Sequence, residues 1–255
     1  MGKVYLVGAG PGAPDLLTLR AARVLGRADI VFHDALVHPE VIALASRARI
    51  VAVGKRCSQI STDQRFINRA LVEAAHRHDT VVRLKGGDPM IFGRAQEEID
   101  ALRAAGVEFE VVPGVTAALS ASAELGLSLT RRGVSRSVLL ATPRVGVDEQ
   151  PGQWARAVAS ADTAVLYMGS GEADAIAAAL RAAGLARDCP AAIVGRASLP
   201  DRQVLHATLG TLGEQAAKVE RGPALVIVGE ALRGSTAASA PAGSEIPISA
   251  ALGRR

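Results

Sequence analysis

Four loops of the sequence place glycine, proline and charged residues together in patterns that suit a ligand site. The first loop, "LVGAGPGAPD", has Gly8, Gly10 and Ala13 at the G-x-G-x-x-A spacing of dinucleotide-binding proteins, directly after an apolar run. Pro11 and Pro14 interrupt this loop, and each removes a backbone N–H group that could bind a phosphate oxygen. The glycine spacing thus favours a dinucleotide, whereas the two prolines argue against one.

A carboxylate in the second loop, "VFHDAL", keeps a dinucleotide interpretation open. Asp34 follows Ala13 by about 20 residues, which is where the acidic residue of a Rossmann fold binds a ribose hydroxyl. An aspartate at this place can equally cap a helix by accepting hydrogen bonds from backbone N–H groups. An NAD-dependent dehydrogenase is therefore one alternative that the residue pattern allows.

The third and fourth loops combine conformational freedom with polar side chains. In "VVRLKGGDPMIFGRAQEE", Gly86 and Gly87 permit close approach of a ligand, and Asp88 before a proline is biased toward an extended conformation. In "VVPGVTAALSASAELGLSLTRRG", small residues surround Thr116, and two arginines follow near a turn. Each loop also has an ordinary structural interpretation, namely a strand-to-helix turn in the third and a tightly packed helix in the fourth.

These loops follow apolar runs that alternate with stretches of helical period, which is the βαβ pattern of a parallel sheet. In the first half the pattern predicts strands at Val4–Val7, Ile30–His33, Ile50–Val53, Val81–Leu84 and Glu108–Val112. It predicts helices at Leu16–Leu25, Asp63–His76 and Arg94–Ala105. Ligands of such sheets bind beyond the carboxyl ends of the strands, which is why the four loops are the candidate sites.

The same alternation continues in the second half of the chain. It predicts strands at Val138–Ala141, Thr163–Tyr167, Ala191–Val194 and Ala224–Val228. It predicts helices at Gln153–Ala159, Glu172–Ala183 and Leu212–Lys218. We therefore expect two α/β domains, 1–114 and 115–233, and a disordered tail over the Ser-, Ala-, Gly- and Pro-rich segment 234–255.

The composition describes a globular protein with a modest positive charge. Its 255 residues are 49% hydrophobic and carry a formal net charge of +4, which suits a polyanionic ligand. Aromatic residues make up only 3%, and no Lys/Arg-rich run occurs, so we expect no nucleic-acid partner. Cys57 and Cys189 lie far apart without metal-ligand spacing, and no apolar run is long enough to span a membrane. We expect a cytoplasmic protein with no metal and no membrane partner.

Six segments taken together resemble one known family. They occur in the order "VYLVGAGPGAPDLLTL", "ADIVFHDALV", "VGKR", "VVRLKGGDPMIFGRAQEE", "VVPGVTAA" and "LTRRG". In this order and spacing the chain resembles the tetrapyrrole methylases over roughly residues 3–232. The segments are most similar to those of members that methylate uroporphyrinogen III.

The resemblance implies a fold, a cofactor and a set of cofactor-binding residues. Family members have two α/β domains of the class III methyltransferase type, with S-adenosyl-L-methionine in the cleft between them. They release S-adenosyl-L-homocysteine, use no metal and are typically homodimers. The implied cofactor-binding residues here are Pro11, Gly86, Gly87, Asp88, Ile91, Thr116, Ala117, Met168 and Ala197, with Ala224 as a weaker candidate. Glycine turns, an acceptor carboxylate and apolar side chains suit a nucleoside that carries an ammonium group.

The resemblance also implies a reaction on a tetrapyrrole. Two methyl groups go to C2 and C7 of uroporphyrinogen III and give precorrin-2 via precorrin-1, a precursor of sirohaem and cobalamin. By motif position Asp34 is the proton acceptor and Lys55 the proton donor. The substrate carries several carboxylates, which suit basic side chains. The predicted ligands are Lys85, Arg131 and Arg132, with Lys55, Arg56 and Arg94 as further cations on loops or element ends.

Three departures from the family pattern bear on substrate identity. Ala13 stands where an aspartate is usual, Arg131 where a histidine is usual, and "ATPR" at 141–144 replaces a Gly-His pair. The last two lie on the tetrapyrrole side of the motifs. Alternatives within the fold are a later corrin-pathway enzyme such as precorrin-4 C-methyltransferase and, more distantly, the diphthine-forming methylase. A non-enzymatic alternative is a regulatory protein that binds the ligand without catalysis.

Overall fold

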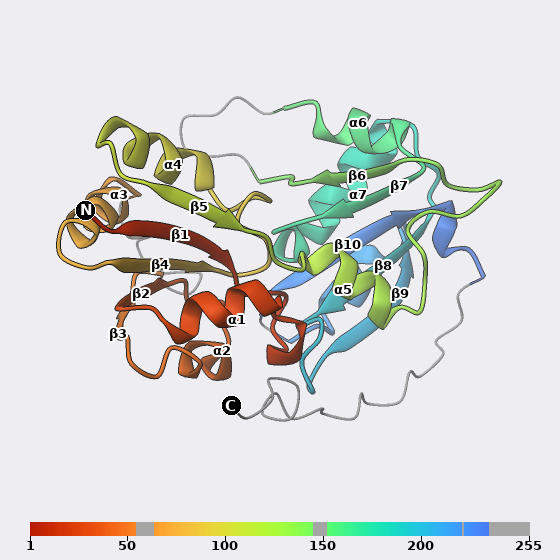
Figure 1. The fold of residues 1–255 in the computed structure, drawn as a ribbon. Helices are drawn as coiled ribbons and strands as arrows, with labels where there is room; N and C mark the ends of the chain where they lie inside the picture. Colours follow the sequence, from red (N-terminus) through yellow and green to blue (C-terminus); the bar gives the residue numbers. More distant parts are fainter. Residues whose placement is uncertain (55–63, 145–151, 221, 235–255) are drawn as a thin grey trace. The chain divides into compact units, whose positions relative to one another are not determined.

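The computed structural model describes residues 1–54, 64–144, 152–220 and 222–234, which fall into two compact units. The first unit comprises Met1–Ala117, and the second begins at Ala118. Both units are α/β, which confirms the predicted fold class (Figure 1). Of the predicted tail, only Gly234 is among the described residues.

The first unit is built on a sheet of five parallel strands. They are β1 (Lys3–Gly8), β2 (Ile30–His33), β3 (Arg49–Ala52), β4 (Thr80–Lys85) and β5 (Phe109–Val112). Hydrogen bonds join them in the order β3-β2-β4-β1-β5. The sequence predicted each strand to within one residue at either end, because strands covered on both faces are recognisable as continuous apolar runs.

Helices cover both faces of this sheet (Figure 1). They are α1 (Leu19–Gly26), α2 (Pro39–Ala43), α3 (Gln64–Ala75) and α4 (Ala95–Ala104). Val4 and Leu6 of β1 pack with α3 and α4, whereas Tyr5 and Val7 pack with α1 and α2. The alternation along one strand therefore produces a three-layer, doubly wound unit. The sequence did not predict α2, whose five residues are too few to show a helical period.

The second unit is built on a mixed sheet. Its strands are β6 (Val138–Ala141), β7 (Thr163–Leu166), β8 (Pro190–Gly195), β9 (Gln203–Thr208) and β10 (Ala224–Gly229), in the order β6-β7-β10-β8-β9. Only β6 and β7 are parallel neighbours, since β10 is antiparallel to β7 and β8, and β9 is antiparallel to β8. The expectation of continued βαβ units is thus wrong here. The sequence missed β9 because all its residues are only half-buried and its apolar pattern is weak.

Helices pack on this second sheet as well. They are α5 (Ala117–Glu124), α6 (Trp154–Ser160), α7 (Ala173–Ala182) and α8 (Leu212–Ala216). Leu166, Ile193 and Val226 of the sheet form one core cluster with residues of α6, α7 and α8. Figure 1 shows α5 across the opposite face of the sheet. Its first turn is fixed there because the Ala118 N–H donates a 3.2 Å hydrogen bond to the Tyr167 hydroxyl.

Three glycines let three strand ends of the first unit meet. Gly8 ends β1, Gly87 follows β4 and Gly114 follows β5. A Cβ on Gly8 would lie 2.6 Å from the Gly114 Cα and 2.7 Å from the Gly87 carbonyl oxygen. A Cβ on Gly114 would lie 2.9 Å from the Gly8 Cα and nearer still to that same oxygen. All these distances are shorter than a Cβ tolerates, so the crossing of the three segments requires glycine at Gly8 and Gly114.

This glycine crossing predicts a selective loss of stability. Gly114→Ala should lower the free energy of unfolding by about 1–3 kcal/mol, because backbone and not a flexible side chain opposes the new methyl group. Gly26→Ala is the matched control, since no atom lies within 4 Å of a Cβ there. It should leave stability unchanged or raise it by up to about 1 kcal/mol. Urea unfolding followed by circular dichroism measures both, and equal midpoints for the two variants would contradict the crossing.

Candidate active site

The carboxyl edge of the first sheet brings most of the predicted site residues of this unit together. Pro11 follows β1, Asp34 follows β2, the 86–88 turn follows β4, and Thr116 follows β5. The turn is joined to the opening loop by two hydrogen bonds between Gly10 and Gly87, of 2.7 and 3.2 Å. These loops follow four consecutive strands of the sheet, in the order β2-β4-β1-β5, so residues distant in sequence form one candidate site.

The opening loop has little to offer a phosphate. The Ala9 N–H donates to the Lys85 carbonyl at 2.8 Å, and the Gly10 N–H donates to the Gly87 carbonyl. Pro11 carries no N–H, and neither does Pro14, which begins a short 3-10 helix, Pro14–Leu16. Two donors of the loop are thus already bonded and two positions carry no N–H group, which argues against the dehydrogenase alternative.

Asp88 organises the turn that follows β4. Its Oδ1 accepts from the Met90 N–H at 2.8 Å, and its Oδ2 accepts from the Gly114 N–H at 2.9 Å. Each carboxylate oxygen keeps a second acceptor position, so the side chain can both hold the turn and bind a hydroxyl or ammonium group. Beside it, Gly87 has φ +66°, and a Cβ there would approach no atom closer than 3.9 Å. Backbone is therefore open to a ligand next to Thr116 and Ala117.

A buried charge network lies behind this edge, and we call it the Glu98 network. It consists of Asp34, Arg83, Lys85 and Glu98, the last of which is fully buried in α4. Arg83 donates from Nε to Glu98 Oε1 at 3.0 Å and from a terminal nitrogen to Asp34 Oδ1. Lys85 Nζ reaches both Glu98 oxygens at 2.9 and 3.0 Å. Two cations thus balance two carboxylates.

The network perturbs both of its cations. Burial alone lowers the pKa of Arg83, but the attraction of Asp34 and Glu98 outweighs it and raises that pKa above the usual value. Burial, together with repulsion from Arg83, lowers the pKa of Lys85 despite its contact with Glu98. Arg83 is therefore a permanent cation that lies in hydrogen-bond contact with the Asp34 carboxylate.

Lys85 does not fit its predicted role as a substrate ligand. Only 2% of the residue is exposed, and its ammonium group is occupied by Glu98. A carboxylate of a macrocycle could not reach it without displacing a buried ion pair, so we correct this prediction. Arg94, by contrast, is exposed and pairs with Glu97. Lys55 and Arg56 lie outside the described residues.

The second unit also gathers predicted cofactor residues at one sheet edge. Met168 follows the carboxyl end of β7, and Ala197 follows that of β8. Ala224 begins β10 at the same edge, since it pairs with Gly195. Helix α5 supports both loops: Ala118 is bonded to Tyr167, the residue before Met168, as described above.

The second support from α5 is Glu124. Its Oε1 accepts from the Ser198 N–H at 3.1 Å, and its Oε2 pairs with Arg202. Glu124 thus holds the loop that contains Ala197 from both sides. The sequence did not predict a role for this residue, and no local signal distinguishes it from an ordinary helical glutamate.

Backbone strain is concentrated in these loops. Among the described residues, positive φ angles of non-glycine residues occur at Phe92 (50°), Arg94 (54°), Met168 (59°), Arg196 (51°) and Ser198 (69°). All five lie in or beside loops that contain predicted cofactor residues. Left-handed conformations of side-chain-bearing residues cost energy and cluster at ligand sites, so their distribution supports the predicted positions.

Arg131 and Arg132 lie elsewhere in the second unit. They belong to a tight turn in which Arg131 and Ser135 exchange two backbone hydrogen bonds, of 2.9 and 2.7 Å. This turn precedes β6, at the amino ends of β6 and β7, whereas Met168 follows the carboxyl end of β7. Both arginines are exposed, and the described contacts do not join them to Met168 or Ala197.

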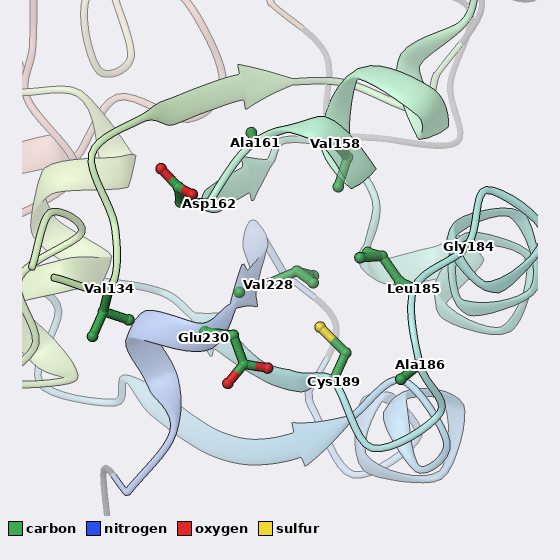
Figure 2. Close-up of a pocket in the computed structure, with 11 residues that line it drawn as sticks. Val134, Val158, Ala161, Asp162, Gly184, Leu185, Ala186, Cys189, Val228 and Glu230 are labelled. Carbon is green, nitrogen blue, oxygen red and sulfur yellow. The ribbon is translucent and has the colours of Figure 1, made fainter.

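A pocket of about 270 Å³ opens at that amino edge, and none of its lining residues is a predicted site residue. Figure 2 shows the Cys189 sulfur directed toward its middle, with Val228 and Glu230 nearby. Its carboxylates already have partners: Asp162 accepts from Arg136 and Ser137, and Glu230 pairs with Arg233. The bond from the Arg136 N–H is the main reason that the pKa of Asp162 lies below its usual range.

Two kinds of feature are missing from the part of the chain that the structure describes. No group of three or more His, Cys, Asp and Glu side chains is arranged there to hold a metal ion. None of the described helices is long and apolar enough to cross a bilayer.

Comparison with known proteins now identifies the family. The profile of Tetrapyrrole (Corrin/Porphyrin) Methylases matches residues 3–213, and the chain belongs to this family. A more particular likeness is to the uroporphyrinogen-III C-methyltransferase of Pseudomonas aeruginosa, with 44% identity over 91% of this chain and 95% of that protein. The crystal structure of uroporphyrin-III C-methyl transferase from Thermus thermophilus, complexed with S-adenyl homocysteine, is 44% identical with a TM-score of 0.80. It covers 91% of this chain and 99% of its own.

Other relatives are longer or more distant. Siroheme synthase 1 of Klebsiella pneumoniae is 45% identical over 91% of this chain, but the chain spans about half, 49%, of that relative's length. A solved cobalt precorrin-4 methyltransferase is only 27% identical, although its TM-score is also 0.80. The family prediction from the six segments is confirmed, and the precorrin-4 alternative is the more distant relation.

The position of Cys189 in the 270 Å³ pocket predicts that its thiol reacts slowly with alkylating reagents. Burial, and to a lesser extent the Glu230 charge, raise the pKa of Cys189, so the thiol is protonated at neutral pH. In a Cys57→Ser background, iodoacetamide should alkylate it far more slowly than free cysteine, whose pKa is about 8.5. Glu230→Gln should accelerate the reaction, because it removes a negative charge that favours the protonated form. A rate equal to that of free cysteine across the pH range would contradict the burial of this thiol.

Proposed function

We propose that this chain transfers methyl groups from S-adenosyl-L-methionine to C2 and C7 of uroporphyrinogen III, giving precorrin-2 via precorrin-1. The observation that carries the proposal is the pair of relatives at 44% identity over nine-tenths of the chain, which bear this activity in their names. The site geometry agrees, since predicted cofactor residues gather at one sheet edge in each unit. A regulatory protein without catalysis is the remaining alternative.

The residues present fit a folded nucleoside cofactor and fit a pyrophosphate poorly. Open backbone at Gly87, spare acceptor positions on Asp88 and the apolar Ile91 and Met168 would receive the adenosine and its amino-acid end. S-adenosyl-L-methionine, when bound, supplies a methyl group already activated on a sulfonium. We infer that Pro11, Gly86, Thr116, Ala117 and Ala197 also bind this cofactor, as the family resemblance implies, with S-adenosyl-L-homocysteine as product and no metal.

Asp34 is the proposed proton acceptor of the reaction. Methylation of a pyrrole carbon leaves a proton that the macrocycle must lose, and an ionised carboxylate within reach can take it. Arg83 supports this role, because its guanidinium places a positive charge beside Asp34 and its hydrogen bond orients one carboxylate oxygen. About 30% of the Asp34 side chain remains exposed at the sheet edge, where a substrate can approach. Lys55 is proposed as the proton donor on the family resemblance alone.

Exposed cations are the proposed ligands of the substrate carboxylates. Arg94 lies beside the 86–91 turn, and Arg131 and Arg132 are exposed on their turn in the second unit. Because Arg can grip a carboxylate with two nitrogens, these side chains suit a polycarboxylate. The family resemblance supports a homodimer with domains near 1–114 and 115–233. The lack of a cysteine framework suits a cytoplasmic protein, and the composition of 234–255 supports a disordered tail.

Product mass tests the proposed reaction directly. Anaerobic incubation of the chain with uroporphyrinogen III and S-adenosyl-L-methionine should give a tetrapyrrole that is heavier by two methyl groups. S-adenosyl-L-homocysteine should bind in a calorimetric titration, and NAD should not. Binding without any mass gain would favour the regulatory alternative, and a gain on a later corrin intermediate alone would favour the precorrin-4 alternative.

Glu124 provides a test of the cofactor residues in the second unit. Glu124→Ala removes the acceptor of the Ser198 N–H and the partner of Arg202, so the loop that carries Ala197 loses its support. The loss of one such hydrogen bond can raise a dissociation constant by a factor of up to about 10. We therefore expect S-adenosyl-L-homocysteine to bind about 3- to 10-fold more weakly. Glu214→Ala, which breaks only an exposed pair with Lys218, is the control. An unchanged dissociation constant in Glu124→Ala would remove this loop from the cofactor site.

A further inference from the structure

The Glu98 network lies outside the proposed reacting groups, yet it ends on one of them. Glu98 and Lys85 are buried beneath the sheet edge, and Asp34 is the only member with substantial exposure. Arg83 connects the two ends, since it bonds both carboxylates. From this connection we propose that Glu98 is a positioning residue for the methyl-transfer reaction: it fixes the Arg83 guanidinium, which holds the Asp34 carboxylate in its working orientation.

The geometry of Arg83 carries the first step. Each of its three nitrogens has a different partner: Nε donates to Glu98, one terminal nitrogen to the Leu84 carbonyl at 3.1 Å, and the other to Asp34. The guanidinium is planar and rigid, so three bonds in different directions leave it one orientation. Glu98 is fixed in turn, because Gln64 of α3 also donates to its Oε1 at 3.2 Å. Glu98 in the helix layer therefore fixes Arg83, and Arg83 fixes Asp34 at the sheet edge.

Stability alone gives a poor account of this arrangement. Two cations and one carboxylate with exposures of 3%, 2% and 0% have lost nearly all their hydration. Replacing such a buried cluster by apolar residues of similar size is often neutral or stabilising. A cluster whose one exposed end is the proposed proton acceptor has a simpler explanation as a support for that residue. Arg83 alone would have to balance the charges of both Asp34 and Glu98. Lys85 adds the second positive charge and so balances Glu98.

Two variants separate positioning from stability. Glu98→Gln removes one charge and leaves Lys85 without a counter-ion, so it should lower both the melting temperature and kcat. The double variant Glu98→Gln/Lys85→Met removes one charge of each sign, and it should recover much of the melting temperature. Because the neutral amide holds the Arg83 guanidinium without the charge-assisted bond of Glu98, we expect kcat to stay reduced by roughly 10-fold or more in both variants. KM for each substrate and the dissociation constant of S-adenosyl-L-homocysteine should stay within about 2-fold.

The control is Asp100→Asn, on the same helix α4, whose carboxylate is exposed and bonded only at the surface. It should leave kcat and the melting temperature unchanged. Recovery of kcat together with the melting temperature in the double variant would overturn the proposal, because Glu98 would then serve stability alone. An unchanged kcat in Glu98→Gln would overturn it as well.

This inference rests on the proposed function, and the two can fail separately. Absence of a methylated product from the unaltered chain would overturn the proposed function. The positioning contacts have a readout of their own, since a crystal structure of Glu98→Gln should show Arg83 turned away from Asp34. An unmoved Arg83 and Asp34 in that structure would contradict the inference whatever the reaction is.

Discussion

Close backbone contact at the carboxyl edge of the first sheet is the constraint on which the candidate site depends. Gly8 and Gly114 let the ends of β1 and β5 cross each other and the Gly87 carbonyl at distances that a Cβ on either residue would forbid. The crossing places the opening loop against the 86–88 turn and brings the Gly114 N–H to Asp88. Without it, the loops after β1, β4 and β5 would be held apart by side chains. The glycines therefore matter here for the space that they leave to one another, and not for phosphate binding.

Two kinds of interaction stabilise the loops of each unit that carry predicted site residues. Short backbone hydrogen bonds fix the loops of the first unit, and helix α5 fixes those of the second through Ala118 and Glu124. A buried set of charges supports the one carboxylate, Asp34, that faces outward. If the proposed roles are right, hydrogen bonds hold the cofactor loops of each unit in place and Arg83 orients the proposed proton acceptor, which is the preorganisation that catalysis requires.

The sequence predicted the strands of the first unit closely and placed its candidate loops at their carboxyl ends, because apolar runs, glycines and prolines act locally. It could not predict the Glu98 network. Glu98 follows Glu97 in the same helix, and only the packing of α3 and α4 decides that one is buried and the other exposed. One signal was available: Arg83 and Lys85, two residues apart, share one face of a strand that is otherwise apolar, which implies a buried counter-ion. The reversed direction of β10 depends on tertiary pairing and had no local signal.

The shared carboxylate of Glu98 has a consequence for how this chain can evolve. Loss of the charge at Arg83, Lys85 or Glu98 leaves the buried network with unequal numbers of positive and negative charges, which is a costly kind of substitution. Relatives that descend from this chain should therefore either keep Arg83, Lys85 and Glu98 or change at least two of them together. These residues should vary as a block among descendants of this chain, whereas the exposed pair of Arg94 and Glu97 is free of that particular barrier.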